Sequence, residues 1–311
     1  MRNSIKVFAP ATVANVVCGY DVLGFAVNAP GDEVVMRLTE TKGIIISKIT
    51  GDGGKLPLSP EKNTVSASVQ HYLNHIGKPD FGLDIELHKK MPIGSGLGSS
   101  SASTVAGLFA VNSLFDNLLT NQELVPFAMK GEELACGYGH ADNVAPALMG
   151  GFVLIRSYEP LDIISLPHPE DMHAAIVYPE VDVPTKDARQ MIRSKVLLKD
   201  AVTQWGNVAG LVSGLFMKDY DLIGRSMTDV LVEPTRAILI PDFYVLRQLA
   251  LGAGAIGFGI SGSGPSVFAL TKDAETANKI TEKLQSHLKG LAINSLSFVS
   301  EVNKKGPVIL D

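Results

Sequence analysis

A glycine- and serine-rich segment, MPIGSGLGSSSAS at residues 91–103, constrains this chain more than any other feature. Gly94, Gly96 and Gly98 alternate with other residues, and the small or apolar stretch over 102–119 contains no proline and a single glycine. This pattern predicts a loop that opens directly into a helix. Glycines allow positive φ, so successive N–H groups can turn inward around an anion, and a helix N-terminus adds about half a positive charge. The segment therefore predicts a polyphosphate site.

A flexible linker, a Walker A loop and a dinucleotide fingerprint each account for this glycine pattern less well. Gly/Ser-rich segments are often linkers, but a linker does not run without a break into a helix of buried type. No Gly-Lys-Ser/Thr sequence ends the segment, which excludes a Walker A loop. No tight βαβ unit with the expected acidic residue surrounds it, which excludes a dinucleotide fingerprint. Because the segment contains no lysine, the charge of a bound phosphate must be neutralised by backbone dipoles, a metal and residues elsewhere.

The composition indicates a globular cytoplasmic protein. The chain has 311 residues, of which 46% are hydrophobic and 19% charged, so a sizeable core is possible and disorder is not expected. A net charge of -5 without long charged runs argues against nucleic acid or an anionic membrane as the main partner. No apolar run approaches the roughly twenty residues that span a bilayer, and the N-terminus does not read as a signal peptide. Cys18 and Cys136 form no zinc or disulfide pattern, so free thiols in a reducing compartment are expected.

The first half of the chain is expected to mix strands and helices. Strands are predicted over Ile5–Phe8, Val34–Leu38, Ile44–Ile49, Leu83–Leu87 and Gly150–Ile155. The second and third of these are separated by Lys42-Gly43, which suggests an antiparallel pair. Apolar residues at helical spacing predict a helix over Asn63–Ile76. Thr120 and Glu123 form a capping box, which predicts another helix ending near Cys136.

Prolines and acidic residues cluster over 158–170, and we expect the domain boundary there, with one domain over 1–160 and a second over 161–311. The second half contains predicted strands at Ala174–Tyr178, Ile256–Gly259, Ser266–Leu270 and Ser295–Val299. Helices are predicted at Val196–Lys218, Leu222–Leu231, Phe243–Ala253 and Ala274–Leu288. Since strands and helices do not alternate strictly, the expected class is α+β with mostly antiparallel sheets.

Polar residues beside apolar or glycine-rich stretches are the candidates for chemistry. Asn15 and Asp21 flank Gly19 after the first strand, where they could also simply stabilise a turn. Glu132 precedes GYGHADNVAP at 137–146, in which a histidine and an amide could join the carboxylate around a metal and a substrate. Glu132 could equally lie on a solvated helix face, and His140 could equally be a polar residue whose hydrogen bonds are satisfied within the fold.

Three further sets lie in the second half. Thr185 with Arg189, and Arg236 beside an apolar run, hint at anion binding, although single arginines are usually surface charges. The segment ISGSGPS at 260–266 is a second glycine loop that could cover phosphates or form a tight hairpin.

Taken together, these motifs resemble the GHMP kinase superfamily, which includes galactokinase, homoserine kinase, mevalonate kinase and phosphomevalonate kinase. The resemblance rests on PATVAN…GYD at 10–21, PIGSGLGSS at 92–100 and SGSGP at 261–265. HADNVAP at 140–146, Thr185 with Arg189, and EPTR at 233–236 match the homoserine kinase branch in particular. Val17 and Cys18 stand where Gly and Pro are usual in the first motif.

The resemblance implies a GHMP kinase fold: an N-terminal domain with a left-handed βαβ crossover and a ferredoxin-like C-terminal domain, with ATP between them. Ser100 and Glu132 would hold Mg²⁺, and Asn63 would line the adenine pocket. The remaining implied nucleotide-binding residues are Pro92, Ile93, Gly94, Ser95, Gly96, Leu97, Gly98, Ser99, Ser100, Ser101, Gly262, Ser263 and Gly264.

By the same resemblance the second substrate is L-homoserine, a zwitterion with a distal hydroxyl. Asp21 would bind its ammonium group, and Arg189 with Arg236 its carboxylate, which suits the planar fork of arginine. The other implied substrate-binding residues are Asn15, His140, Asn143 and Thr185.

The implied reaction is ATP-dependent phosphorylation of the homoserine hydroxyl to O-phospho-L-homoserine, in threonine biosynthesis. Asn143, Ser100 and Glu132 form the predicted catalytic set. Mevalonate kinase-type relatives carry an aspartate suited to act as a base near the place of Asn143, and an amide cannot accept a proton at neutral pH. We therefore predict direct in-line transfer without a side-chain general base.

The resemblance also implies a homodimer, while the charge balance argues against nucleic acid or a membrane as a partner. Two alternatives remain open for the function. One is a GHMP kinase for another small alcohol, and the other is a catalytically silent ATP-binding sensor, against which the retained Ser100 and Glu132 argue.

Overall fold

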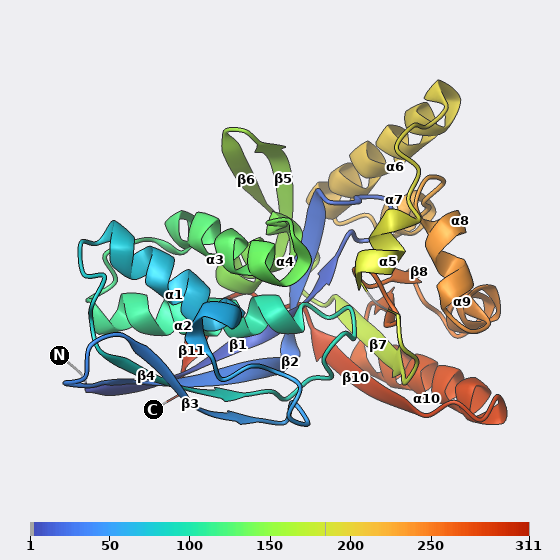
Figure 1. Cartoon of the computed structure of the whole chain (residues 1–311). Coiled ribbons are helices and arrows are strands. Elements are labelled where there is room, and N and C mark those ends of the chain that lie inside the picture. The colour runs from blue at the N-terminus through green and yellow to red at the C-terminus, as the bar shows by residue number, and fades with distance from the viewer. Residues whose placement is uncertain (1–2, 184, 311) are drawn as a thin grey trace.

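The computed structural model describes residues 3–183 and 185–310, apart from the side chains at 135–136 and 185–187. Its first half is built on a seven-stranded sheet, whose main path runs β11-β1-β2-β4-β3 (Figure 1). The strands on this path are β1 Ser4–Ala14, β2 Leu23–Leu38, β3 Ile44–Thr50, β4 Leu83–His88 and β11 Val308–Ile309. A hairpin of β5 (Phe152–Tyr158) and β6 (Leu161–Leu166) joins the sheet where β5 pairs with the start of β2.

One predicted strand pairing is wrong. The segments on either side of Lys42-Gly43 do not form an antiparallel pair, because β4 lies between β2 and β3 and runs parallel to β3. The turn is wide enough to admit β4: Thr39 N–H donates to the Gly82 carbonyl, and Leu83 N–H donates to that of Gly43. β3, α1 (Thr64–His75) and β4 therefore make the βαβ unit of this half.

Four helices cover this sheet, and α2 (Ser99–Leu114) is the most deeply buried of them (Figure 1). α2 packs on β1 and β2 and is surrounded by α1, α3 (Asn121–Cys136) and α4 (Ala141–Met149). Its small side chains allow this close packing on all sides. The glycine loop therefore ends in a helix that is fixed by the core.

The second half contains a four-stranded antiparallel sheet in the order β10-β7-β9-β8. Its strands are β7 His173–Pro179, β8 Gly257–Ile260, β9 Val267–Thr271 and β10 Ser295–Glu301. In chain order this is 4-1-3-2, the ferredoxin-like arrangement that the family resemblance implied. Alternate residues along the strands face opposite ways, so Ile176 and Phe268 join the core of the first half, while Val177 and Val267 pack with the helices behind.

The remaining helices all belong to the second half of the chain, and the last two of them pack against this sheet (Figure 1). They are α5 Thr185–Gln190, α6 Leu198–Met217, α7 Tyr220–Ser226, α8 Glu233–Arg236, α9 Phe243–Leu251 and α10 Ala274–Gly290, with short 3₁₀ turns at Pro60–Lys62 and Ala237–Leu239. No helix within the described ranges is both long enough and apolar enough to span a bilayer.

The division of the chain at residue 160 stays a prediction. β5 and β6 pair across that point, and β11 returns from the C-terminus to pair with β1. Strand pairing thus favours a division nearer His173, where the second sheet begins, with the last strand belonging to the first sheet.

Candidate active site

A cleft of about 1130 Å³ runs between the glycine loop and the second half of the chain. Most of the residues proposed from the sequence line it, and they come from several separate elements. From the nucleotide set these are Asn63, Ile93, Gly94, Ser95, Gly96, Gly98, Ser99, Ser100, Ser101, Gly262 and Ser263. From the other sets they are Asn15, Asp21, Glu132, His140, Asn143, Arg189 and Arg236.

Three proposed nucleotide-binding residues do not line the cleft: Pro92, Leu97 and Gly264. The side chain of Leu97 is fully buried in the core, so it anchors the loop rather than facing a ligand. Asn63 has a structural task as well, because it caps α1 by accepting from Val65 N–H at 3.1 Å. The side chain of Thr185 lies outside the described part of the chain.

The glycine loop has the predicted backbone geometry. Gly94, Gly96 and Gly98 have φ of 73°, 79° and 65°, the left-handed region that favours glycine. Gly98 is the N-cap of α2, so the loop leads directly to free N–H groups at a helix N-terminus. This arrangement suits a polyphosphate.

The second glycine loop docks on the first. Ser261 Oγ donates to the Gly96 carbonyl at 2.7 Å, and Ser266 N–H donates to the Ser95 carbonyl at 3.1 Å. A Cβ at Gly96 would lie 2.5 Å from the Ser261 carbonyl oxygen, so only glycine fits at this contact. The two halves of the chain therefore meet at the phosphate loop.

Gly98 joins the loop to the rest of the cleft. A Cβ there would lie 2.2 Å from Thr12 Oγ1 and 2.9 Å from Asn143 Oδ1. Thr12 Oγ1 also donates to Asn143 Oδ1 at 2.7 Å, which leaves the amide NH₂ of Asn143 as the group that can face a ligand. Asn143 is thus held next to the N-terminus of α2.

Ser100 and Glu132 form a buried polar pair beside the helix N-terminus. Within the described part of the chain, Ser100 Oγ and Glu132 Oε1 are buried and have no hydrogen-bond partner. Burial raises the pKa of Glu132, while the nearby hydroxyls of Ser100 and Ser101 and the charge of Lys89 oppose that rise. An unpartnered hydroxyl and carboxylate oxygen in a phosphate site are the hard ligands that a divalent cation needs. No cluster of three or more acidic, His or Cys side chains suited to a metal occurs among the described residues.

Lys89 is a cleft residue that the sequence motifs do not single out. Its ammonium donates to the Ser99 carbonyl at 2.7 Å and to Ser103 Oγ at 2.6 Å, and it forms an ion pair with Asp32. Burial lowers its pKa, against the attraction of Asp32. Lys89 lies directly before the glycine loop in the sequence, and this position could have marked it as a candidate site residue. It fixes the first turn of α2 from behind.

The turn after β1 has an unusual backbone. Asn15, Val17 and Asp21 have φ of 71°, 63° and 59°, and for the β-branched Val17 this is a rare conformation. Gly259 leaves space for Val17, since a Cβ there would lie 2.5 Å from Val17 Cγ2. Cys18 is buried, which raises its pKa to about 12 and keeps it a thiol.

This turn presents two predicted substrate residues. Asn15 Oδ1 accepts from Asp21 N–H at 3.0 Å, and its amide donates to the Gly262 carbonyl at 2.9 Å. Both carboxylate oxygens of Asp21 accept hydrogen bonds from the Arg189 guanidinium, at 2.9 and 3.4 Å. His140 Nδ1 lies 3.8 Å from Asp21 Oδ1, and burial lowers the pKa of this histidine.

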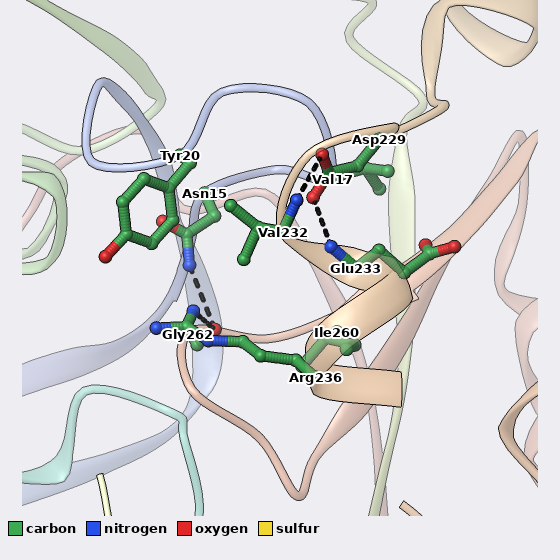
Figure 2. A pocket seen from close by; sticks show the side chains of 9 residues that line it. All are labelled: Asn15, Val17, Tyr20, Asp229, Val232, Glu233, Arg236, Ile260 and Gly262. Atoms are coloured by element: carbon green, nitrogen blue, oxygen red, sulfur yellow. Dashed lines mark hydrogen bonds between the residues drawn. The ribbon is translucent and has the colours of Figure 1, made fainter. Parts of the chain in front are cut away.

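Arg236 lies deeper than Arg189 and is 4% exposed. Its guanidinium donates to the Gly262 carbonyl at 3.0 Å and sits 5.1 Å from the Tyr20 ring centroid, but no ion pair with an acidic side chain neutralises it among the described residues. Figure 2 shows how the helix that bears Arg236 is anchored. The Asp229 carboxylate accepts from the N–H groups of Val232 and Glu233 at 3.0 and 2.8 Å, which fixes the start of α8. Arg236 and Asn15 then converge on the same carbonyl (Figure 2).

Asp142 is the second cleft residue that sequence reasoning missed. It is buried, and its Oδ1 has no hydrogen-bond partner within the described part of the chain. Burial, with the charge of Asp21 next, raises its pKa from 3.8 to about 7. The motif HADNVAP contains the residue, but the motif alone does not place Asp142 in the buried first turn of α4. Asp142 therefore places a carboxyl group with a pKa of about 7 in the same pocket as Arg189 and Arg236.

Comparisons with known proteins agree with this geometry. Family models for the GHMP kinases N terminal domain and the GHMP kinases C terminal match residues 63–151 and 210–290, together more than half of the chain. Homoserine kinase from Chlorobium phaeobacteroides strain BS1 is 47% identical over 97% of this chain and 98% of its own length. The crystal structure of homoserine kinase from Cytophaga hutchinsonii has a TM-score of 0.97 at 57% identity, covering 100% of this chain and 98% of its own. The crystal structure of L. major mevalonate kinase with R-mevalonate shares the fold alone, with 15% identity, a TM-score of 0.73, and 97% and 98% coverage.

The glycine loop leads into a buried helix of the first domain and contacts a ferredoxin-like second domain. Together with both family models, this arrangement shows that the chain belongs to the GHMP kinase family. Within that family it groups with the homoserine kinases, which match it over almost its whole length.

Proposed function

We propose that the chain transfers the γ-phosphoryl group of ATP to the hydroxyl of L-homoserine, giving O-phospho-L-homoserine for threonine biosynthesis. The observation that carries the proposal is the position of Asn143. Its Oδ1 would lie 2.9 Å from a Cβ at Gly98, at the end of the glycine loop, and it lines the same cleft as Asp21, Arg189 and Arg236. The full-length likeness to homoserine kinases supports the choice of acceptor.

The nucleotide is proposed to lie along the glycine loop, with its phosphates at the N-terminus of α2. Backbone N–H groups there supply partial positive charge without a side chain. Ser100 and Glu132 fit a Mg²⁺ ion, because each has a buried oxygen without a partner. When bound, the ion would neutralise charge on the phosphates. Asn63 and the neighbouring Pro57 would border the adenine.

The amino-acid end of the pocket is proposed to bind homoserine by its two charges. Asp21 and Arg189 pair with one another in the structure, so each has the charge that the opposite end of a zwitterion needs. A substrate placed between them would replace one ion pair by two. Arg236, buried beside the same pocket, adds a second group for the carboxylate. An analogue without the carboxylate would leave that guanidinium unmatched and should be rejected strongly.

The proposed chemical step is direct in-line displacement. The homoserine hydroxyl oxygen forms a bond to the γ-phosphorus as the bond to the ADP oxygen breaks, and its proton leaves to a phosphate oxygen or to water. Asn143 orients the hydroxyl through its amide NH₂ and cannot act as a base. Alignment of the reactants can contribute about 7–11 kcal/mol in favourable systems, which makes a base dispensable.

ADP release in a coupled assay, with homoserine, mevalonate and galactose offered separately, tests the proposal. Release with homoserine alone is expected. Release with mevalonate or galactose would favour a kinase for another alcohol, and no release with any acceptor, despite ATP binding, would favour a sensor. The base-free step is tested by Asp142→Asn at saturating homoserine. We expect kcat to fall less than about tenfold, whereas loss of a general base lowers rates by about 10²–10⁴-fold.

A further inference from the structure

A buried glutamine on α6 links two segments that support the amino-acid end of the cleft. Within residues 198–207, which the structure describes in full, Gln204 is the one buried side chain, with 7% of its surface exposed. Its Nε2 donates to the Cys18 carbonyl at 2.7 Å, and its Oε1 accepts from Val230 N–H at 3.0 Å. A carbonyl on one side and an N–H on the other match the donor and the acceptor of a primary amide. Gln204 therefore joins segments that lie far apart in the sequence.

The first of these segments is the turn after β1, which presents Asp21. Val16, Val17 and Asp21 have φ of 40°, 63° and 59°, the left-handed region that β-branched residues rarely adopt. Such a backbone persists only where neighbouring groups hold it in place. Cys18 follows the two valines directly, and its carbonyl is the group that Gln204 binds. Helix α6 thus holds the turn at its strained part.

The second segment leads into α8, which bears Arg236. The Asp229 carboxylate accepts from the three N–H groups at 231–233, at 2.9, 3.0 and 2.8 Å. Gln204 accepts from the N–H group just before them, that of Val230. Two side chains therefore hold four successive N–H groups, and they fix where α8 begins.

Packing alone does not set the separation of these two segments. A cavity of about 20 Å³ lies between them, lined by the turn on one side and by the segment that enters α8 on the other (Figure 2). A space of this size can hold about one water molecule. On the cleft side, Asn15 and Arg236 both donate to the Gly262 carbonyl. Gln204 is a second link, and it lies outside the cleft.

We propose that Gln204 is a positioning residue for the amino-acid substrate, because it sets the separation between Asp21 and Arg236. The inference rests on the proposed function, in which these two side chains bind the ammonium group and the carboxylate of homoserine. The substrate carries both groups on one carbon atom, so the two protein groups must be held at a matching separation. Gln204, Cys18 and Val230 do not line the cleft, so the effect passes through the backbone of the two segments.

Initial-rate kinetics of Gln204→Met test this role. Methionine is similar to glutamine in size and in helix propensity, but it cannot form either hydrogen bond. KM for homoserine should rise at least about tenfold, while kcat falls less than about threefold and KM for ATP changes less than about twofold. A loss of folded protein alone would lower kcat in proportion to the folded fraction and would leave both KM values unchanged.

Asn207→Ala is the matched control on the next turn of the same helix. Asn207 Nδ2 donates to the Thr228 carbonyl at 2.8 Å, so it ties α6 to the segment before α8 but does not reach the turn after β1. KM for homoserine should change less than about twofold in this variant, as for most surface substitutions. A rise equal to that of Gln204→Met would overturn the role assigned to the link between the two segments.

A double-mutant cycle with Arg236→Met tests whether Gln204 acts through Arg236. Adding Gln204→Met to Arg236→Met should lower kcat/KM for homoserine less than about threefold further, because the group that Gln204 places is then absent. Effects that multiply fully, an unchanged KM for homoserine in Gln204→Met, or an equal rise in both KM values would overturn this inference alone. An unmodified chain that releases no ADP with homoserine would overturn the proposed function, and this inference with it.

Discussion

The two proposed ends of the cleft, one for the phosphates and one for the amino acid, are built in opposite ways. The phosphate end is one continuous segment, 94–101, whose backbone takes the shape that an anion needs. The amino-acid end is built from side chains on separate elements: Asp21 follows β1, Asn143 lies on α4, Arg189 on α5 and Arg236 on α8. A backbone site depends on local geometry. A side-chain site depends on how the whole fold brings distant residues together.

Charge differs between the two ends as well. At the phosphate end the buried Lys89 is neutralised by Asp32, and the loop offers the partial charges of its N–H groups to the ligand. At the other end the charges of Asp21, Arg189 and Arg236 all act on the pKa of the buried Asp142. We expect substitutions at the first end to act through shape and those at the second end to act through charge.

The largest expected effect comes from removing a buried charge at the amino-acid end. Arg236→Met should lower kcat/KM for homoserine by about 10²–10³-fold, because truncating one member of a buried charge pair costs about 2–5 kcal/mol. KM for ATP should change little. Initial-rate kinetics with each substrate varied in turn measure both. Arg225→Met, at an exposed arginine of α7, is the matched control. An equal rise in both KM values would show that the two ends do not act separately.

The phosphate end should respond to shape in the absence of any charge change. Gly96→Ala should lower kcat/KM for ATP about a hundredfold, since the new Cβ would lie 2.5 and 2.7 Å from the carbonyl oxygens of Ser261 and Gly264. Gly94→Ala is the matched control: its φ of 73° carries the same strain of roughly 1–2 kcal/mol, but its Cβ would meet nothing within 4 Å. ATP-dependent rates for the two variants separate contact from strain. Similar losses in both would mean that strain alone governs the loop.

The same contrast explains what the sequence could predict. The glycine loop, the capping box of Thr120 with Glu123 and the strands of the second sheet are local patterns, and the structure confirms them. The helix predicted over Leu222–Leu231 is shorter than expected, because α7 ends at Ser226. The pairing of β3 with β4 was not predictable from the turn at Lys42-Gly43, because it depends on where a later strand inserts. The prediction grouped the residues of the amino-acid end by their resemblance to a known family, because no local sequence pattern links them.

The site residues that sequence analysis missed are those whose character depends on burial. Lys89 and Asp142 are ordinary charged residues in the sequence, and only their burial gives them a distinct character. Gln204 is a similar case, because helical spacing predicts the helix α6 but not which side of it the rest of the chain covers. In each case the missing information is the position of segments that lie far away in the sequence.

The smallest expected effect is a change in the pH dependence of stability, and it tests whether charge dominates the amino-acid end. The pKa of Asp142 is raised from 3.8 to about 7 in the folded chain, so between these values the folded state holds a proton that the unfolded state has lost. This contribution to stability is fully present below pH 3.8 and is lost as the pH rises through about 7.

Relative to Asp142→Asn, the chain with Asp142 should therefore lose roughly 2–3 kcal/mol of unfolding free energy between about pH 5 and pH 8. Urea unfolding of both proteins without ligands, at several pH values, measures the difference. Asp116→Asn, at an exposed aspartate in a turn, controls for the loss of a surface charge. A difference between Asp142 and asparagine that stays constant with pH would mean that the carboxyl is ionised throughout. The amino-acid end would then hold one more fixed negative charge opposite Arg236, and its preference for a zwitterion would have to arise from shape rather than from the balance of charges.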